Sequence, residues 1–148
     1  MSHTSTISSV IITDLNALRA AISELKGQGV NCDLLENAKP RAYYADQQGM
    51  GQAPYVVRLN DGPYDVGLYR NQADTGYEAK CDTYGGHVAR YLGAETTGEE
   101  SRAQGAMGKL LNLYAVQAAT REATRKGYRV QRINQPNGGV QLQIRQAA

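Results

Sequence analysis

The chain has 148 residues, a formal net charge of +2, and a hydrophobic content of 41%. This length fits one domain with a core of its own, and this composition excludes a wholly disordered chain. Apolar runs such as Val10–Ile12 are far too short to span a bilayer, and the N-terminus lacks the basic start and apolar middle of a signal peptide. We therefore expect one cytoplasmic domain over residues 1–148, with no membrane partner.

The first half of the chain predicts one helix among several strands. Residues 4–12 are rich in β-branched side chains and predict a strand. Asp14 is a suitable N-cap for a helix whose apolar residues recur at helical spacing up to Gly27. Further strands are predicted at 32–35, 55–59, 64–70 and 77–82. Asp61-Gly62 is typical of a tight hairpin turn, in which glycine supplies a positive φ.

Two glycine-rich stretches, near residues 45–54 and 84–102, predict mobile connections. Residues 87–92, within the second stretch, are compatible with a single helical turn.

The second half predicts a long helix and then a hairpin. One apolar stripe marks the helix: Met107, Leu110, Leu111, Tyr114, Ala115 and Ala118. Gly127 is suited to end it, and the basic residues before Gly127 complement the helix dipole. Strands at 128–135 and 140–145 flank Asn137-Gly138, which is a strong hairpin signal.

Together these elements predict an α+β fold. Hairpins imply an antiparallel sheet, and two amphipathic helices need an apolar sheet face to cover. We expect a two-layer sandwich in which two amphipathic helices lie on one face of an antiparallel sheet of about five to six strands, related to ferredoxin-like folds.

The stretches YDVGLYRN and YEAKCD alternate apolar with charged or aromatic side chains along two predicted strands. Their candidate sheet-face binding residues are Asp65, Tyr69, Arg70, Glu78 and Lys80. The simpler interpretation is that these charges, with Asp82, line the solvated face of a one-sided sheet. No histidine or third group completes an acid–base set here, so we assign no catalytic residue.

Charge is unevenly divided along the chain. The first hundred residues carry eight basic and thirteen acidic side chains, whereas residues 101–148 carry eight basic and one acidic. The candidate site for nucleic acid or an acidic partner is the basic cluster Arg121, Arg125, Lys126, Arg129 and Arg132. The alternative interpretation is that the two halves of the chain neutralise each other within one fold.

The residue types of a soft metal site occur at His3, Cys32, Cys81 and His87 and nowhere else in the sequence. Zinc ligands normally come in close pairs, and this spacing lacks them. We therefore expect no metal and no other cofactor, and two free cysteines in the core.

Several stretches carry a family resemblance: TDLNALRAAISEL, YDVGLYRN with YEAKCD, LLNLYAVQAATREATRKGYRV and GGVQLQIR. Together they resemble an uncharacterised family typified by a conserved hypothetical open reading frame of algal plastid genomes, which also occurs in cyanobacteria and their phages. The resemblance covers most of the chain with gaps, and departs from the family pattern at Thr4, at residues 41–43 and at residues 83–85. It implies a cyanobacterial, plastid or phage setting, hence the host cytoplasm for a phage protein, and implies no activity.

Signals for the fold are abundant in this sequence, and signals for chemistry are sparse. We therefore expect a non-catalytic binding or adaptor protein that acts through protein–protein contacts. The alternative is a nucleic-acid-binding protein that uses the basic end of the C-terminal helix and the next strand. An enzyme is the least favoured hypothesis. An unpaired strand edge would also allow a homodimer.

Overall fold

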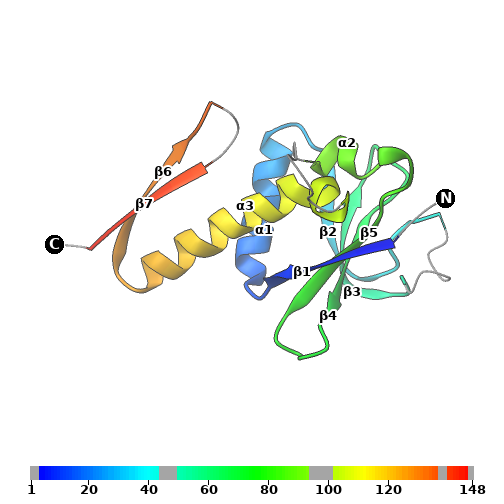
Figure 1. The fold of residues 1–148 in the computed structure, drawn as a ribbon, viewed down its shortest axis with the longest axis horizontal. Helices are drawn as coiled ribbons and strands as arrows, with labels where there is room; N and C mark the ends of the chain where they lie inside the picture. The colour runs from blue at the N-terminus through cyan, green and yellow to red at the C-terminus, as the bar shows by residue number, and fades with distance from the viewer. Residues whose placement is uncertain (1–3, 44–49, 94–101, 137–139, 147–148) are drawn as a thin grey trace.

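The computed structural model describes residues 4–43, 50–93, 102–136 and 140–146 (Figure 1). Its strands are β1 (Thr4–Ile12), β2 (Cys32–Ala38), β3 (Ala53–Leu59), β4 (Val66–Arg70), β5 (Tyr77–Asp82), β6 (Tyr128–Asn134) and β7 (Val140–Gln146). Its helices are α1 (Leu15–Gly27), α2 (Ala89–Leu92) and α3 (Arg102–Arg125), with a 3-10 turn at Tyr84–Gly86. The predicted strands and helices are confirmed in order, with small shifts at their ends.

The first five strands form one antiparallel sheet in the order β1-β5-β4-β3-β2. Strands β2 to β5 follow one another as a meander, and β1 adds to the free side of β5. The two strands that flank α1 in the sequence therefore lie at opposite edges of the sheet. For this reason α1 must cross the sheet, and it packs there beside α3 (Figure 1). This confirms the predicted α+β fold.

The core lies between the sheet and the two long helices. Leu18 and Leu25 of α1, Leu68 of β4, and Met107 and Leu110 of α3 are all fully buried in it. Burial of each such side chain contributes about 1.5–3 kcal/mol.

The predicted apolar stripe of α3 is correct for most of its members, because Met107, Leu110, Leu111 and Tyr114 are buried. It is wrong for Ala115, which is exposed, whereas Leu113 is buried. Burial therefore extends around α3 from the predicted stripe toward Leu113.

The ends of the helices follow local sequence signals. The side chain of Asp14 accepts a hydrogen bond from the amide of Ala17 at 3.0 Å, as expected for an N-cap. Gly127, with φ +85°, ends α3 as predicted. Tyr114 adds a tertiary tie, because its hydroxyl accepts hydrogen bonds from the amides of Thr13 at 2.9 Å and Asp14 at 3.2 Å.

The expected role of Gly62 is wrong. A hairpin does join β3 to β4, but Gly62 is not among the glycines with positive φ. A Cβ built on Gly62 would lie 2.8 Å from Cε2 of Tyr91. A side chain at this position would therefore displace the ring of Tyr91.

The C-terminal hairpin is a separate two-stranded sheet. Strands β6 and β7 pair with each other and are not part of the five-stranded sheet. They contact α3 and extend away from its C-terminal end (Figure 1). The predicted turn at Asn137-Gly138 lies outside the described residues.

The two predicted mobile connections are only partly described. Residues 44–49 and 94–101 lie outside the described residues. At the end of the first connection, Ala53 already belongs to β3. In the second connection, Tyr84–Gly86 form the 3-10 turn and Ala89–Leu92 form α2, which confirms the helical turn predicted at residues 87–92. None of the described helices is long and apolar enough to cross a membrane.

Candidate binding surfaces

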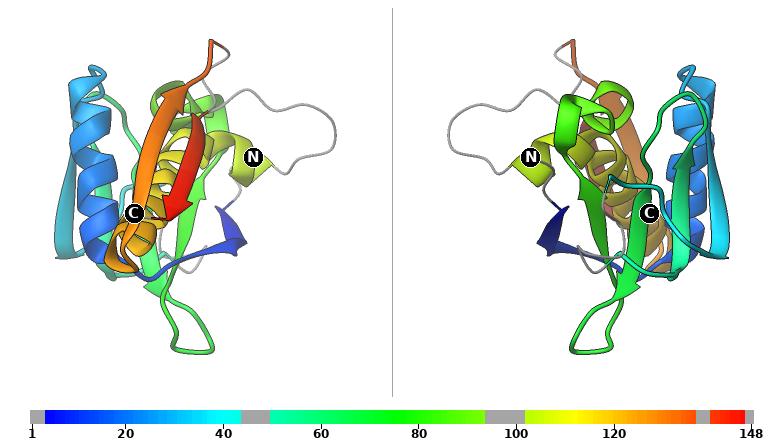
Figure 2. Two further views of the ribbon diagram at one scale, coloured as in Figure 1. Left: turned by 90° about the vertical axis from the view of Figure 1, so that its left-hand side faces the viewer. Right: turned by 90° about the vertical axis from the view of Figure 1, so that its right-hand side faces the viewer.

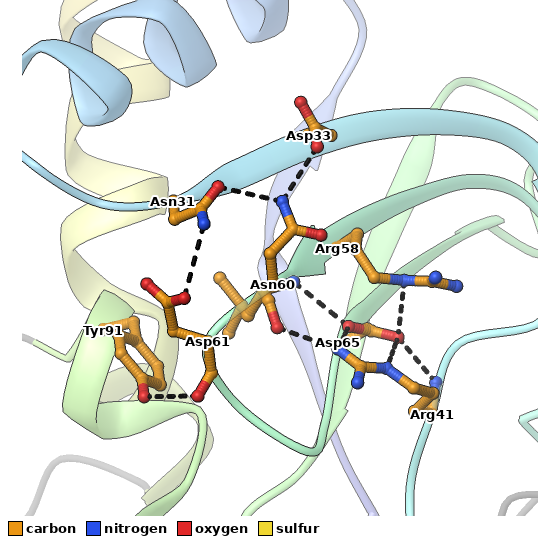
Figure 3. Close-up of polar contacts among 9 residues, drawn as sticks. Asn31, Asp33, Arg41, Arg58, Asn60, Asp61, Asp65 and Tyr91 are labelled. Atoms are coloured by element: carbon orange, nitrogen blue, oxygen red, sulfur yellow. Dashed lines mark hydrogen bonds and ion pairs between the residues drawn. The ribbon is translucent and has the colours of Figure 1, made fainter.

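Asp65 does not lie on a solvated face, which corrects the prediction. Its side chain is fully buried just before β4, where it accepts hydrogen bonds from Nε and Nη2 of Arg41 at 3.0 and 2.8 Å (Figure 3). The amide of Leu59 donates to it at 3.1 Å, and Nε of Arg58 lies 3.3 Å from Oδ2. A buried carboxylate that is paired and hydrogen-bonded in this way is a structural anchor.

Asp65 anchors a segment that crosses the outer face of the sheet, opposite the helices. We call residues 39–43 the strap. The Arg41 amide donates to Asp65 at 2.9 Å, and the Asp65 amide donates to the Arg41 carbonyl at 3.0 Å. Pro40 is buried over Gly67, where a Cβ would lie 3.0 Å from its Cγ. The strap therefore covers part of the face that the sequence suggested was in water.

Asp82 holds the far end of the strap and is also buried, contrary to expectation. One of its carboxylate oxygens accepts a hydrogen bond from the Tyr43 amide at 3.0 Å, and the other accepts one from the Tyr84 amide at 2.9 Å. The two buried aspartates thus share one role, since each binds backbone amide groups of a covering segment.

Tyr69, Glu78 and Lys80 do lie together on the outer face. The register pairs Tyr69 with Glu78, and the Lys80 ammonium lies 5.1 Å from the Tyr69 ring centroid. The Tyr69 hydroxyl donates to the Gly51 carbonyl at 2.8 Å, and burial raises the pKa of this phenol to about 12. All three side chains are half-buried, so they form a small, partly covered patch.

Arg70 does not belong to that patch. The register places it opposite Tyr77, and its guanidinium lies 5.1 Å from the Tyr77 ring. It also forms an ion pair with Asp74 at 2.6 Å. Because successive residues of a strand point to opposite faces, Arg70 and Tyr69 cannot act on one sheet-face ligand.

A polar cluster lies beside the Asp65 anchor (Figure 3). The side-chain amide of Asn60 donates through Nδ2 to Oδ1 of Asn31 at 3.0 Å and to Oδ2 of Asp33 at 2.8 Å. The side-chain amide of Asn31 donates through Nδ2 to Oδ1 of Asp61 at 3.3 Å, and the Tyr91 hydroxyl donates to the backbone carbonyl of Asp61 at 2.9 Å. These groups satisfy one another, which is the pattern of a structural network.

An open hollow of about 370 Å³ adjoins this network and is lined by Lys26, Gly29, Val30, Asn31, Cys32 and Asp33. Lys26 is paired with Asp33 at 3.1 Å. Burial raises the pKa of the Cys32 thiol, which opposes formation of a nucleophilic thiolate. The lining therefore offers no activated nucleophile with its base.

The basic cluster is largely neutralised within the fold. Arg121 pairs with Asp14 at 3.0 Å, and Arg132 pairs with Glu24 at 2.6 Å. Arg125 and Lys126 both pair with Glu122. Arg129 is exposed and makes no ion pair with any described residue. Two of these pairs, Arg121–Asp14 and Arg132–Glu24, join the basic second half of the chain to its acidic first half. They agree with the alternative interpretation, in which the two halves neutralise each other within one fold.

Two pairs of large apolar side chains are exposed on the described part of the chain. Tyr43 and Tyr84 are 56% and 42% exposed and lie against each other, with ring centroids 5.6 Å apart. Tyr128 of β6 and Ile144 of β7 are 41% and 50% exposed on the C-terminal hairpin. Neither pair was evident from the sequence. Tyr43 and Tyr84 lie outside the strands, and the apolar pattern of β6 and β7 does not reveal which face stays uncovered.

Both cysteines are buried and free, as predicted. Burial, together with the adjacent Asp82, raises the pKa of the Cys81 thiol to about 12. The His87 ring packs edge-on against Tyr64 at 5.1 Å, and His3 lies outside the described residues. No cluster of three or more His, Cys, Asp or Glu able to hold a metal ion occurs within the described ranges.

Comparison of the chain with protein-family models, with curated proteins and with solved structures found no match.

Proposed function

We propose that the protein is a non-catalytic binding protein that contacts another protein through its β6–β7 hairpin. The observation that carries this proposal is the half-exposed apolar face of that hairpin. The register pairs Val130 with Ile144, so Tyr128, two residues before Val130, shares their face. Apolar surface left open on a sheet that contacts the rest of the fold mainly through α3 is typical of a protein interaction site.

The marginal stability of small sheets supports the same proposal. An isolated two-stranded hairpin is marginally stable in water, and packing against a further element normally completes it. Here α3 supplies part of that packing, and Arg132 adds an ion pair to Glu24 of α1. A partner that covers Tyr128 and Ile144 would supply the remainder.

Ion pairing weakens the nucleic-acid alternative. A phosphate-binding surface needs cations that are free to replace counterions. In the basic cluster, Arg121, Arg125, Lys126 and Arg132 each have a carboxylate partner, and Arg129 is the exception. We place the protein in the cytoplasm, and its kinship with the plastid and cyanobacterial family stays a prediction.

Affinity capture with matched variants tests the proposed function. Tagged wild-type protein, the hairpin variant Tyr128→Ser/Ile144→Ser and the control variant Tyr43→Ser/Tyr84→Ser are incubated with lysate of the native host. The control removes similarly exposed apolar side chains from a different surface. We expect a discrete protein partner with the wild type and the control, and its loss with the hairpin variant. Identical capture by all three proteins, or no partner for any of them, would contradict the proposal.

A further inference from the structure

We infer that β7 binds an extended, acidic segment of a partner protein as an added strand. This inference rests on the proposed function, which names the hairpin as the contact surface, and it specifies how the partner is held. Strand addition to a sheet edge is a recurring mode of peptide recognition, in which backbone hydrogen bonds supply affinity and side chains supply specificity.

The free edge of the hairpin is β7. Strand β7 pairs with β6 and with no other strand in the described part of the chain. In Figure 2, β6 lies on the α1 side of the hairpin and β7 lies on the opposite side. The ion pair between Arg132 of β6 and Glu24 of α1 agrees with this placement. The outer edge of β7 is therefore the one that a further strand can reach.

This edge is regular, unlike the edges of the main sheet. Its seven residues pair with β6 without a register shift, and they include no proline, lysine or acidic residue. In contrast, β2 is interrupted at Asn37, which has φ +50° and is missing from the ladder to β3. The pairing of β1 shifts between Ile7 and Ile12. Irregularities of this kind protect natural sheet edges from added strands, and β7 lacks them.

Charge selects an acidic segment. Residues 128–148 contain three arginines and no acidic residue. Arg129 and Arg145 face each other directly across the hairpin, and neither forms an ion pair with a described residue. Like charges at directly opposed positions destabilise a strand pair, so carboxylates placed beside them would relieve the repulsion. A second copy of the chain would bring the same arginines together, which disfavours a homodimer at this edge.

The alternation of β7 further defines the segment. Ile144 and Arg145 are neighbours, so they point to opposite faces of the hairpin. An added strand that alternates apolar and acidic residues would place its apolar side chains beside the half-exposed Ile144 and its carboxylates beside Arg145. The partner segment is therefore an extended peptide with alternating apolar and acidic residues.

The test is a titration of the full-length, isotope-labelled protein with synthetic peptides, followed by NMR shifts and amide exchange. The probe peptide alternates Val and Glu. One control peptide alternates Val and Lys, and a second is the Val-Glu peptide with N-methylated backbone amides, which cannot donate ladder hydrogen bonds. We expect saturable binding of the first peptide alone, with slower exchange of amides along β7.

Charge-reversal variants make the test specific. Arg145→Glu places a carboxylate opposite Arg129, a pairing that favours the folded hairpin, and we expect it to weaken binding of the Val-Glu peptide about tenfold or more. Arg90→Glu is the matched control, because Arg90 is exposed on α2 and has no ion pair with a described residue, and we expect it to bind as the wild type does.

Other results would overturn the inference. These are no binding of the Val-Glu peptide, equal binding of its N-methylated form, protection confined to α3, tighter binding of single-stranded RNA, or self-association through β7. If one of them occurs while lysate capture still depends on Tyr128 and Ile144, the inference alone fails. If capture is insensitive to these residues, the proposed function itself fails.

Discussion

Arg132 of β6 binds Glu24 of α1 through two hydrogen bonds, of 2.7 Å from Nη1 to Oε1 and 2.6 Å from Nη2 to Oε2. The two residues are 108 positions apart in the sequence, and their ion pair ties the C-terminal hairpin to the N-terminal helix. This bidentate geometry restricts how the hairpin lies on the rest of the fold, and through it the orientation of the proposed binding edge.

We predict that Arg132→Met lowers the free energy of unfolding by about 1 kcal/mol, because a well-oriented ion pair near the surface is worth about that much. Arg129→Met is the matched control on the same strand, since Arg129 makes no ion pair with a described residue, and it should not lower stability, because it removes the repulsion from Arg145. Urea unfolding of the three proteins measures the difference. Equal stability of both variants would show that the Arg132–Glu24 pair does not hold the hairpin.

The same ion pair predicts a pH dependence. Hydrogen bonding to Arg132 lowers the pKa of Glu24 from its ordinary value of 4.5. A carboxyl whose pKa is lower in the folded state contributes its full stabilisation above the unfolded pKa, and loses it as the pH falls through the folded pKa. The stability difference between the wild type and Glu24→Gln should therefore be constant near neutral pH and shrink as the pH falls below 4.5. Urea unfolding across this range measures it, and a difference that grows on acidification would contradict the assignment.

Asp65→Asn should be among the most destabilising single changes in the chain. It removes the buried negative charge that Arg41 and Arg58 share, at a cost of about 1.5–3 kcal/mol, because the two arginines left without this partner are partly exposed to water. Asp74→Asn, which removes the exposed partner of Arg70, serves as the control and should cost less than about 1 kcal/mol. Thermal and urea unfolding measure both variants. Comparable small effects would mean that the strap does not depend on Asp65.

The packing of the strap is tested separately at Gly67. A Cβ at this position would lie 2.6 Å from Cε2 of Tyr69 and 3.0 Å from Cγ of Pro40, so Gly67→Ala forces both rings to move. We expect a loss of about 1–3 kcal/mol, as for other overpacked sites. Gly51→Ala is the control, because its new Cβ would meet no atom within 4 Å. If the two variants unfold at the same urea concentration, the strap does not pack closely on β4.

Local sequence signals were sufficient for most of the fold. Asp14 caps α1 and Gly127 ends α3, because these residues act on backbone groups within one helical turn. The β6–β7 hairpin was equally predictable from two alternating strands around a turn signal. Its separation from the main sheet was not predictable, since an alternating strand pattern carries no information about which sheet the strand joins.

The burial of the candidate site residues depends on contacts between segments far apart in the sequence, and sequence patterns were less informative about these contacts. Asp65 and Asp82 alternate with apolar residues as solvent-facing positions do, yet the strap buries both. Residues 39–43 have no periodic pattern that would place them over the sheet. The exposure of Ile144 was likewise hidden, because an apolar residue in a strand normally indicates a covered face.

Hydrogen exchange on the complex captured from lysate shows directly whether the β6–β7 hairpin is the binding surface. Amide exchange of the full-length protein is measured by mass spectrometry with and without the bound partner. We expect protection from exchange to concentrate in β6 and β7, and we expect the strap and the Tyr43–Tyr84 surface to exchange as they do in the free protein. Protection centred on Tyr43 and Tyr84, with an unchanged hairpin, would contradict the assignment of the β6–β7 hairpin as the binding surface.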